Sequence, residues 1–230
     1  MFSVFGREET SSTNRVDTVQ GIVYEYLKPF GFRKYGRTLH RFVEGDISQV
    51  INFQNGCPQK GIHNSLRLNI GIRVPECAER KFTVSKPMKK YYHEYECNIR
   101  TRLGSLADGE DTFYNLNLSP EKIAADIIER LGKYFIPVFD VLGSRKAILL
   151  YRKNYPSFDE LTSHLILLDE AMIFGRKGDI EKASEFFNSY YQKALVLNSA
   201  NHGHIDYLEK LAAELGIVLN DIDEQKILKS

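Results

Sequence analysis

A strict alternation of apolar and polar residues between Leu66 and Val74 is the feature that most constrains the fold. Because successive side chains of a strand point to opposite sides of a sheet, this pattern predicts a strand with one buried face and one polar face. Antiparallel sheets commonly have this character. The aliphatic positions are Leu66, Leu68, Ile70, Ile72 and Val74, and the intervening positions are Arg67, Asn69, Gly71 and Arg73.

Shorter runs with the same period extend the predicted sheet to about five strands. The three residues Glu44-Gly45-Asp46 join the first two of these runs as a hairpin. The stretch 75–92 is basic and shows no regular period, so it is predicted to be a long loop. The additional predicted strands are residues 38–43, 49–54, 95–103 and 112–116.

Helical periodicity accounts for most of the remaining residues of the first two thirds of the chain. Residues 15–28 repeat valine and leucine at steps of three and four, which is typical of a helix with one buried face. A second helix is predicted to begin at Pro120, because proline suits the first helical position, and to kink or end at Pro137. With a further helix at 144–153, the pattern predicts an α+β domain over residues 1–153, with helices packed on one face of an antiparallel sheet.

A break at residues 154–156 separates this domain from a predicted C-terminal helical subdomain, residues 157–230. Ser157 and Glu160 match a capping box, which predicts a helix running to about Phe174. A second helix and a third, at about 204–215, complete a helical hairpin or three-helix extension. The second helix carries a seam of apolar residues at spacings of three and four, formed by Ile180, Ala183, Phe187, Tyr190, Ala194 and Leu197.

This seam bears on association with other molecules. If its apolar side is exposed, we expect an unknown protein partner or a homodimer formed through the helical C-terminal region. If it is buried within the chain, that expectation loses its support.

Charge is divided unevenly along the chain although the net charge is only +1. Residues 28–102 contain 15 Lys and Arg against 6 Asp and Glu, whereas residues from Asn154 onward contain 7 against 13. Two interpretations remain open. The basic region could face an anionic partner, or the acidic C-terminal part could dock on it.

Four ordered motifs resemble those of an uncharacterised bacterial family, a domain of unknown function. The resemblance covers roughly residues 20–145 and leaves the helical tail outside. It implies an α+β domain and no assigned activity. The motifs are Gly-Phe-Arg-Lys-Tyr-Gly-Arg-Thr-Leu-His-Arg at 31–41, Gln-Val-Ile-Asn-Phe-Gln at 49–54, Leu-Asn-Ile-Gly at 68–71 and Arg-Thr-Arg-Leu-Gly at 100–104.

The polar positions of these strands form the candidate binding site. If the polar faces of neighbouring strands coincide, the sheet presents guanidinium and carboxamide groups on one side. Arginine binds carboxylates and phosphates through two parallel hydrogen bonds, so the arrangement predicts a face that binds an anion or an acidic surface. The alternative is an ordinary solvated face. The candidate binding residues are Arg41, Asn52, Gln54, Arg67, Asn69, Arg100 and Arg102.

The resulting functional hypothesis is a non-catalytic binding or regulatory protein that engages an acidic or anionic partner through this face. One alternative is a nucleic-acid-binding module in which bases stack on aromatic residues of the basic segment, with Phe30, Phe32, Tyr35 and Phe53 as candidates. Another is a hydrolase-like enzyme with a cleft near His40, which could act as an acid or base beside Arg41.

Several chemistries lack their sequence signatures. The chain has neither the glycine-rich phosphate loop of P-loop proteins nor that of dinucleotide-binding proteins. The three cysteines are an odd number without a close pair, which favours reduced thiols in a cytoplasmic protein. Residues 1–10 show neither the basic nor the apolar region of a signal peptide, so we expect none, and no apolar run is long enough to cross a membrane. We therefore expect no cofactor, no metal ion, no catalytic residue and no membrane association.

Overall fold

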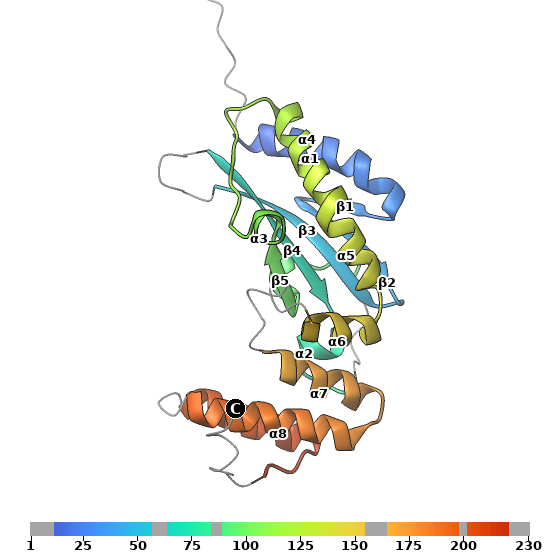
Figure 1. The fold of residues 1–230 in the computed structure, drawn as a ribbon, viewed down its shortest axis with the longest axis vertical. Helices are drawn as coiled ribbons and strands as arrows, with labels where there is room; N and C mark the ends of the chain where they lie inside the picture. The colour runs from blue at the N-terminus through green and yellow to red at the C-terminus, as the bar shows by residue number, and fades with distance from the viewer. Residues whose placement is uncertain (1–11, 57–63, 84–88, 155–164, 198–201, 221–230) are drawn as a thin grey trace, which may run out of the picture.

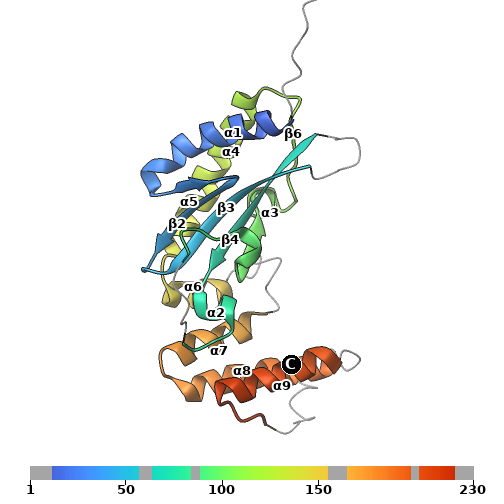
Figure 2. The same cartoon turned by 180° about the vertical axis from the view of Figure 1, so that it is seen from behind.

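The structure is a computed structural model that describes residues 12–56, 64–83, 89–154, 165–197 and 202–220. An antiparallel sheet lies at its centre, with helices on one face, and a stack of C-terminal helices lies beyond one end of the strands (Figure 1). Figure 2 shows the same arrangement from the other side of the sheet. The predicted α+β class, with a helical C-terminal region, is confirmed.

The sheet has five strands in consecutive order, and a short sixth strand pairs with the fourth. Val43 pairs with Ile47, so residues 44–46 form the predicted hairpin turn. All neighbouring strands are antiparallel. The strands are β1 (Arg33–Tyr35), β2 (Thr38–Val43), β3 (Ile47–Asn55), β4 (Ser65–Arg73), β5 (Ile99–Arg102) and β6 (Tyr114–Asn115).

The helices on the sheet bury the aliphatic side of the strands. The first helix, α1 (Ser12–Leu27), packs beside α4 (Pro120–Arg130), and both contribute fully buried residues to one continuous core. Pro137 does not end the helical path after α4. A π-helical turn at Leu131–Phe135 leads directly into α5 (Ile136–Val141), and α6 (Arg145–Asn154) follows. The aliphatic positions of β4 belong to the same core, as the alternation predicts.

Two predictions for the middle of the chain are wrong. The predicted loop 75–92 begins with a helix, α2 (Pro75–Glu79), which has proline at its first position. The predicted strand 95–103 is only the four-residue β5, because Glu94–Glu96 form a 3₁₀ turn and α3 (Leu103–Asp108) begins immediately after the strand. Alternation alone misled here, because the apolar residues Tyr95 and Leu103 continue the two-residue period of β5 although both lie outside the strand.

The C-terminal helices are α7 (Ile166–Arg176), α8 (Ile180–Leu197) and α9 (His202–Leu215). Of the predicted seam, Ala183, Phe187, Tyr190 and Ala194 are buried within the chain, whereas Ile180 is exposed. The seam therefore faces neighbouring helices of the same chain. The predicted capping box at 157–160 lies outside the described residues, and the domain boundary at 154–156 stays a prediction.

The described residues contain neither a membrane-spanning helix nor a cluster of metal-binding side chains. None of the helices described combines the length and the apolar composition that a membrane crossing requires. Within the described ranges, no three histidine, cysteine or acidic side chains come together in a way that could hold a metal ion.

Candidate functional site

The strand register brings most of the predicted binding residues together. Asn52 of β3 lies opposite Asn69 of β4, and Asn69 lies opposite Arg102 of β5. These residues form one row across three strands, and Gln54 and Arg67 form the next. Residues two apart in a strand share a side, so these rows lie on the side of the sheet away from α1 and α4. We call it the polar sheet face, and it comprises Asn52, Gln54, Arg67, Asn69, Arg100 and Arg102.

Arg41 does not belong to this face, so the prediction that it joins the other six is wrong. In β2, Thr38 lies opposite Asn52, so Thr38 and His40 face the polar side, and Arg41, next to His40, points to the helical side. Its guanidinium donates to Gln49 Oε1 at 2.7 Å and to Asp140 Oδ1 at 2.6 Å. It also lies over the ring of Phe32. Arg41 thus holds β2 to α5.

The carboxamide of Gln54 is a hydrogen-bond centre on the polar sheet face. Its Oε1 accepts from Arg67 Nη2 at 2.9 Å and from Asn69 Nδ2 at 2.8 Å. Asn52 is oriented separately, because its Nδ2 donates to Thr38 Oγ1 at 3.2 Å. These bonds fix the carboxamides and Arg67 in place before any ligand arrives, which lowers the entropic cost of binding.

Asp111, a carboxylate outside the predicted set of binding residues, lies between two of the arginines. Asp111 Oδ2 accepts from Nη1 of Arg67 at 3.2 Å and also from Nη1 of Arg102. The side chains of Arg67, Arg102 and Asp111 retain 17%, 29% and 20% of their exposure. The three side chains thus form a partly exposed cluster of two cations and one anion.

Gly104 explains how the Asp111 segment comes so close to β5. A Cβ atom at this position would lie 2.2 Å from the carbonyl oxygen of Glu110 and 2.2 Å from Oγ1 of Thr112. Such distances are not possible, so only glycine allows this approach. Gly71 has a similar role, since a Cβ there would lie 2.6 Å from Sγ of Cys97. Burial, the largest influence, raises the pKa of the Cys97 thiol well above its ordinary value.

The positive charge of the face is partly neutralised by acidic residues of the chain itself. Arg100 pairs with Glu94 at 3.1 Å and Arg73 pairs with Glu79 at 2.6 Å, in addition to the cluster around Asp111. Four arginines therefore meet three carboxylates.

An aromatic row lies beside the polar sheet face. Tyr35 and Tyr91 stack with ring centroids 4.8 Å apart, and His93 and Tyr95 stack at 5.1 Å. Tyr91 and His93 meet edge to face at 5.3 Å and so join the two pairs. Tyr95 is 66% exposed. The row ends in a ring that a partner can reach.

His40 is enclosed by this row. It is 2% exposed, and neither ring nitrogen has a hydrogen-bond partner among the described residues. Burial, and then the nearby Arg33 guanidinium, lower the pKa of His40 below the ordinary histidine value. The imidazole is therefore a neutral, packed group at pH 7.

The aromatic candidates for base stacking are divided between the core and the surface. Phe32 and Phe53 are each 1% exposed and belong to the core, so the prediction that they stack on bases is wrong. Phe30 is exposed and Tyr35 is half-buried.

Comparison with known proteins identifies a family that contains this site. A family model described as a domain of unknown function, DUF4304, matches residues 23–141, just over half of the chain. The chain belongs to this family. No curated protein and no solved structure matched it. The DUF4304 domain contains the whole polar sheet face, Asp111 and the aromatic row.

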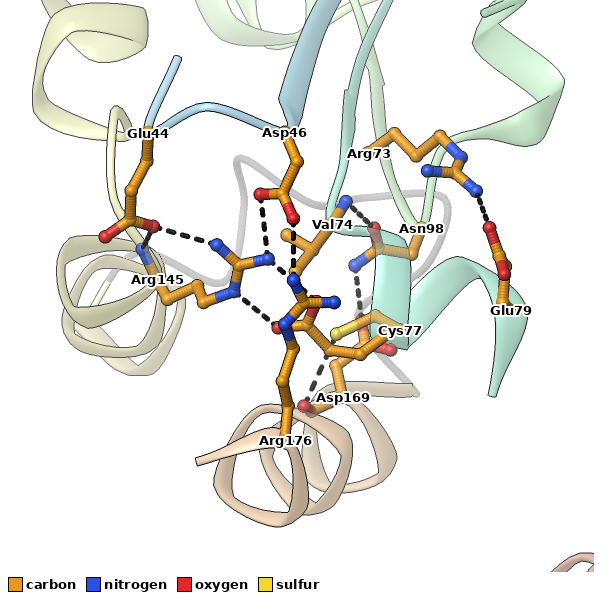
Figure 3. Close-up of polar contacts among 11 residues, drawn as sticks. Glu44, Asp46, Arg73, Val74, Cys77, Glu79, Asn98, Arg145, Asp169 and Arg176 are labelled. Carbon is orange, nitrogen blue, oxygen red and sulfur yellow. Dashed lines mark hydrogen bonds and ion pairs between the residues drawn. The ribbon is translucent and has the colours of Figure 1, made fainter. Parts of the chain in front are cut away.

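A second polar cluster connects the DUF4304 domain to the helices that follow it (Figure 3). Arg145 of α6 donates to both oxygens of Glu76 and pairs with Asp46 at 3.0 Å. Arg176 of α7 pairs with Asp46 at 2.8 Å. Arg145 also contacts Glu44. We call Glu44, Asp46, Glu76, Arg145 and Arg176 the junction network; its acids lie in the DUF4304 domain and its arginines outside.

Asp169 of α7 extends this connection. Its carboxylate pairs with Arg80 and accepts from Asn98 Nδ2 at 2.9 Å, and its carbonyl oxygen lies 3.5 Å from Sγ of Cys77. The Asp169 side chain is almost wholly buried. Buried ion pairs of this kind are costly to break, so the DUF4304 domain and α7 are held together as one structural unit.

Proposed function

We propose that this protein is a non-catalytic binding or regulatory protein whose polar sheet face engages an acidic or anionic partner. The observation that carries the proposal is the convergence of Arg67 and Arg102 on one carboxylate, beside the fixed carboxamides of Gln54 and Asn69. A position that already holds one carboxylate between two guanidinium groups is chemically suited to an acidic ligand.

A binding role is also favoured over a hydrolase by the state of His40. A general acid or base must come within hydrogen-bond reach of the proton that it transfers. The His40 ring is buried among Tyr35, Phe42 and Tyr91, and so it is poorly placed to meet a substrate.

The test uses a fluorescein-labelled hexaglutamate peptide with an amidated C-terminus, whose binding to the full-length protein is followed by fluorescence anisotropy at low salt. We expect Arg67→Gln combined with Arg102→Gln to weaken binding by roughly tenfold or more, because two charge-assisted contacts are removed. The matched control replaces Lys193 and Lys210, both exposed on the C-terminal helices, with glutamine. Equal binding by both double variants would contradict the proposal.

The aromatic row favours one alternative, a module for single-stranded nucleic acid. Tyr95 is exposed and stacked on His93, and Lys89 and Lys90 beside it are exposed. Stacked rings next to cations are typical of surfaces that bind unpaired bases. This alternative predicts that a labelled ten-residue oligouridine binds, that added salt weakens its binding steeply, and that Tyr95→Ala weakens it by about tenfold.

Location and association are also proposals. We infer a cytoplasmic protein, an interpretation supported by Cys77 and Cys97 being buried free thiols, and a bacterial one, which rests only on the resemblance of the four motifs. A homodimer or protein partner through the C-terminal helices receives less support than the sequence suggested, since most of the seam is buried. Sedimentation velocity of the full-length protein tests the homodimer directly.

A further inference from the structure

We propose that Asp111 occupies the carboxylate-binding position of the polar sheet face, and that the carboxylate of an acidic partner displaces it. This inference rests on the proposed function and assigns the chemistry of the ligand. Asp111 thereby sets the affinity of the face, because every ligand must compete with a carboxylate of the protein itself.

The hydrogen bonding of Asp111 is incomplete, which favours displacement. Only Oδ2 accepts from Arg67 and Arg102; Oδ1 is buried and has no hydrogen-bond partner among the described residues. An unsatisfied buried acceptor destabilises the state that contains it. Leaving this position therefore costs Asp111 less than it would cost a fully bonded carboxylate.

Glu76 shows the contrasting case in the same molecule. Both of its oxygens accept from Arg145, a second arginine lies nearby, and its side chain is 0% exposed. Asp111 retains 20% exposure and lies outside any helix or strand. Glu76 is thus locked in place, whereas rotation of the Asp111 side chain is enough to clear its position.

The ligand group that fits best is a carboxylate. Arg67 and Arg102 carry two positive charges against the single charge of Asp111, so the cluster keeps one excess positive charge that attracts a second carboxylate while Asp111 moves aside. It can arrive on an acidic side chain or on the C-terminus of a polypeptide. Both sources present the same planar group to the two guanidinium forks.

The experiment compares full-length Asp111→Asn with the unmodified protein in binding to two labelled peptides. One is hexaglutamate with an amidated C-terminus, and the other is hexaserine with a free C-terminus, so the two sources of the carboxylate are distinguished. We expect Asp111→Asn to tighten binding of the preferred peptide by roughly fivefold, because the competitor is removed while the arginines remain. Glu110→Gln is the matched control, since it removes the same charge from an exposed neighbour.

If only the loss of a negative charge matters, Asp111→Asn and Glu110→Gln tighten peptide binding equally, and that result would overturn the inference. So would unchanged or weaker binding by a folded Asp111→Asn variant. If binding still depends on Arg67 and Arg102 in either case, the proposed function stands. If neither peptide binds the unmodified protein or Asp111→Asn, the proposed function fails too.

A second measurement does not depend on the variant folding. In the unmodified protein, the ¹³C resonance of the Asp111 carboxyl group and the Nε resonances of Arg67 and Arg102 are followed by NMR during peptide addition. Displacement predicts that all three shift together to saturation. A shift of the arginine signals without one at Asp111 contradicts it.

Discussion

Arg145 and Glu76, 69 residues apart in the sequence, form a two-point ion pair at the end of the sheet. Arg145 Nε donates to Glu76 Oε1 at 2.6 Å, and Nη2 donates to Oε2 at 2.9 Å. Paired hydrogen bonds between charged groups are strong and directional. The pair therefore fixes α6 against α2 in one orientation.

Arg145→Leu is expected to lower the free energy of unfolding by about 3–5 kcal/mol, because it leaves a buried carboxylate without its main cation. Urea unfolding followed by circular dichroism measures the loss. Lys146→Leu, at the exposed neighbouring position in α6, is the control and is expected to change stability by no more than about 0.5 kcal/mol. A loss below about 1 kcal/mol for Arg145→Leu would show that the pair is not a structural anchor.

Gly104→Ala is expected to destabilise the protein by about 1–3 kcal/mol, since the added methyl group must push away the backbone that carries Asp111. Thermal unfolding reports the change. Gly21→Ala is the matched control: a Cβ atom there meets nothing within 4 Å, and alanine favours the α1 helix by up to about 1 kcal/mol. Two variants of equal stability would refute this account of Gly104.

His40 predicts a specific dependence of stability on pH. Because its pKa in the folded protein lies below the ordinary value, the unfolded chain takes up the proton first as the pH falls. The contribution of neutral His40 to folding stability is therefore complete above about pH 6.5 and is lost on acidification. Over that range, His40 lowers the free energy of unfolding by at most about 1.4 kcal/mol per pH unit.

The measurement is urea unfolding from pH 8 to pH 5 for the unmodified protein and His40→Leu. The difference between the two curves isolates His40, because other titrating groups are common to both proteins. Phe42→Leu alters a ring beside His40 and retains the imidazole, so it is expected to keep the slope. Parallel curves for the unmodified protein and His40→Leu would remove the prediction.

Phe187→Ala tests whether the seam of α8 is internal. Phe187 is fully buried, so truncation is expected to cost about 3–5 kcal/mol in unfolding free energy. Val196→Ala, at a 47% exposed position of the same helix, is expected to cost far less. If instead the two substitutions cost the same, the helices do not pack on Phe187 as described.

The polar sheet face was largely predictable because strand parity is a local property. The alternation at 66–74 predicts one strand and places Arg67 and Asn69 on its polar side. The shorter alternating runs in the neighbouring strands place the other polar residues on the same side. Arg41 follows His40 in β2, and adjacent strand residues point to opposite sides, so Arg41 lies on the helical side of the sheet. The strand 38–43 was predicted correctly, and only the side of the sheet that Arg41 faces was predicted wrongly.

The acidic partners were not predictable in the same way. Asp111 meets Arg67 across 44 residues, and Arg176 meets Asp46 across 130, so no local pattern links them. The helix α2 did leave a signal, since Pro75 followed by an acidic residue is typical of a helix start. Five residues are too few for a helical period to become visible.

The position of the junction network has a practical consequence for dissecting the protein. The family match ends at residue 141, whereas the cations that neutralise Glu44, Asp46 and Glu76 lie at 145 and 176. A fragment that ends at the family limit would carry three carboxylates without these counter-charges. Its isoelectric point and its solubility would therefore differ from those of the full-length protein. The family limit is therefore not a safe place to cut this protein.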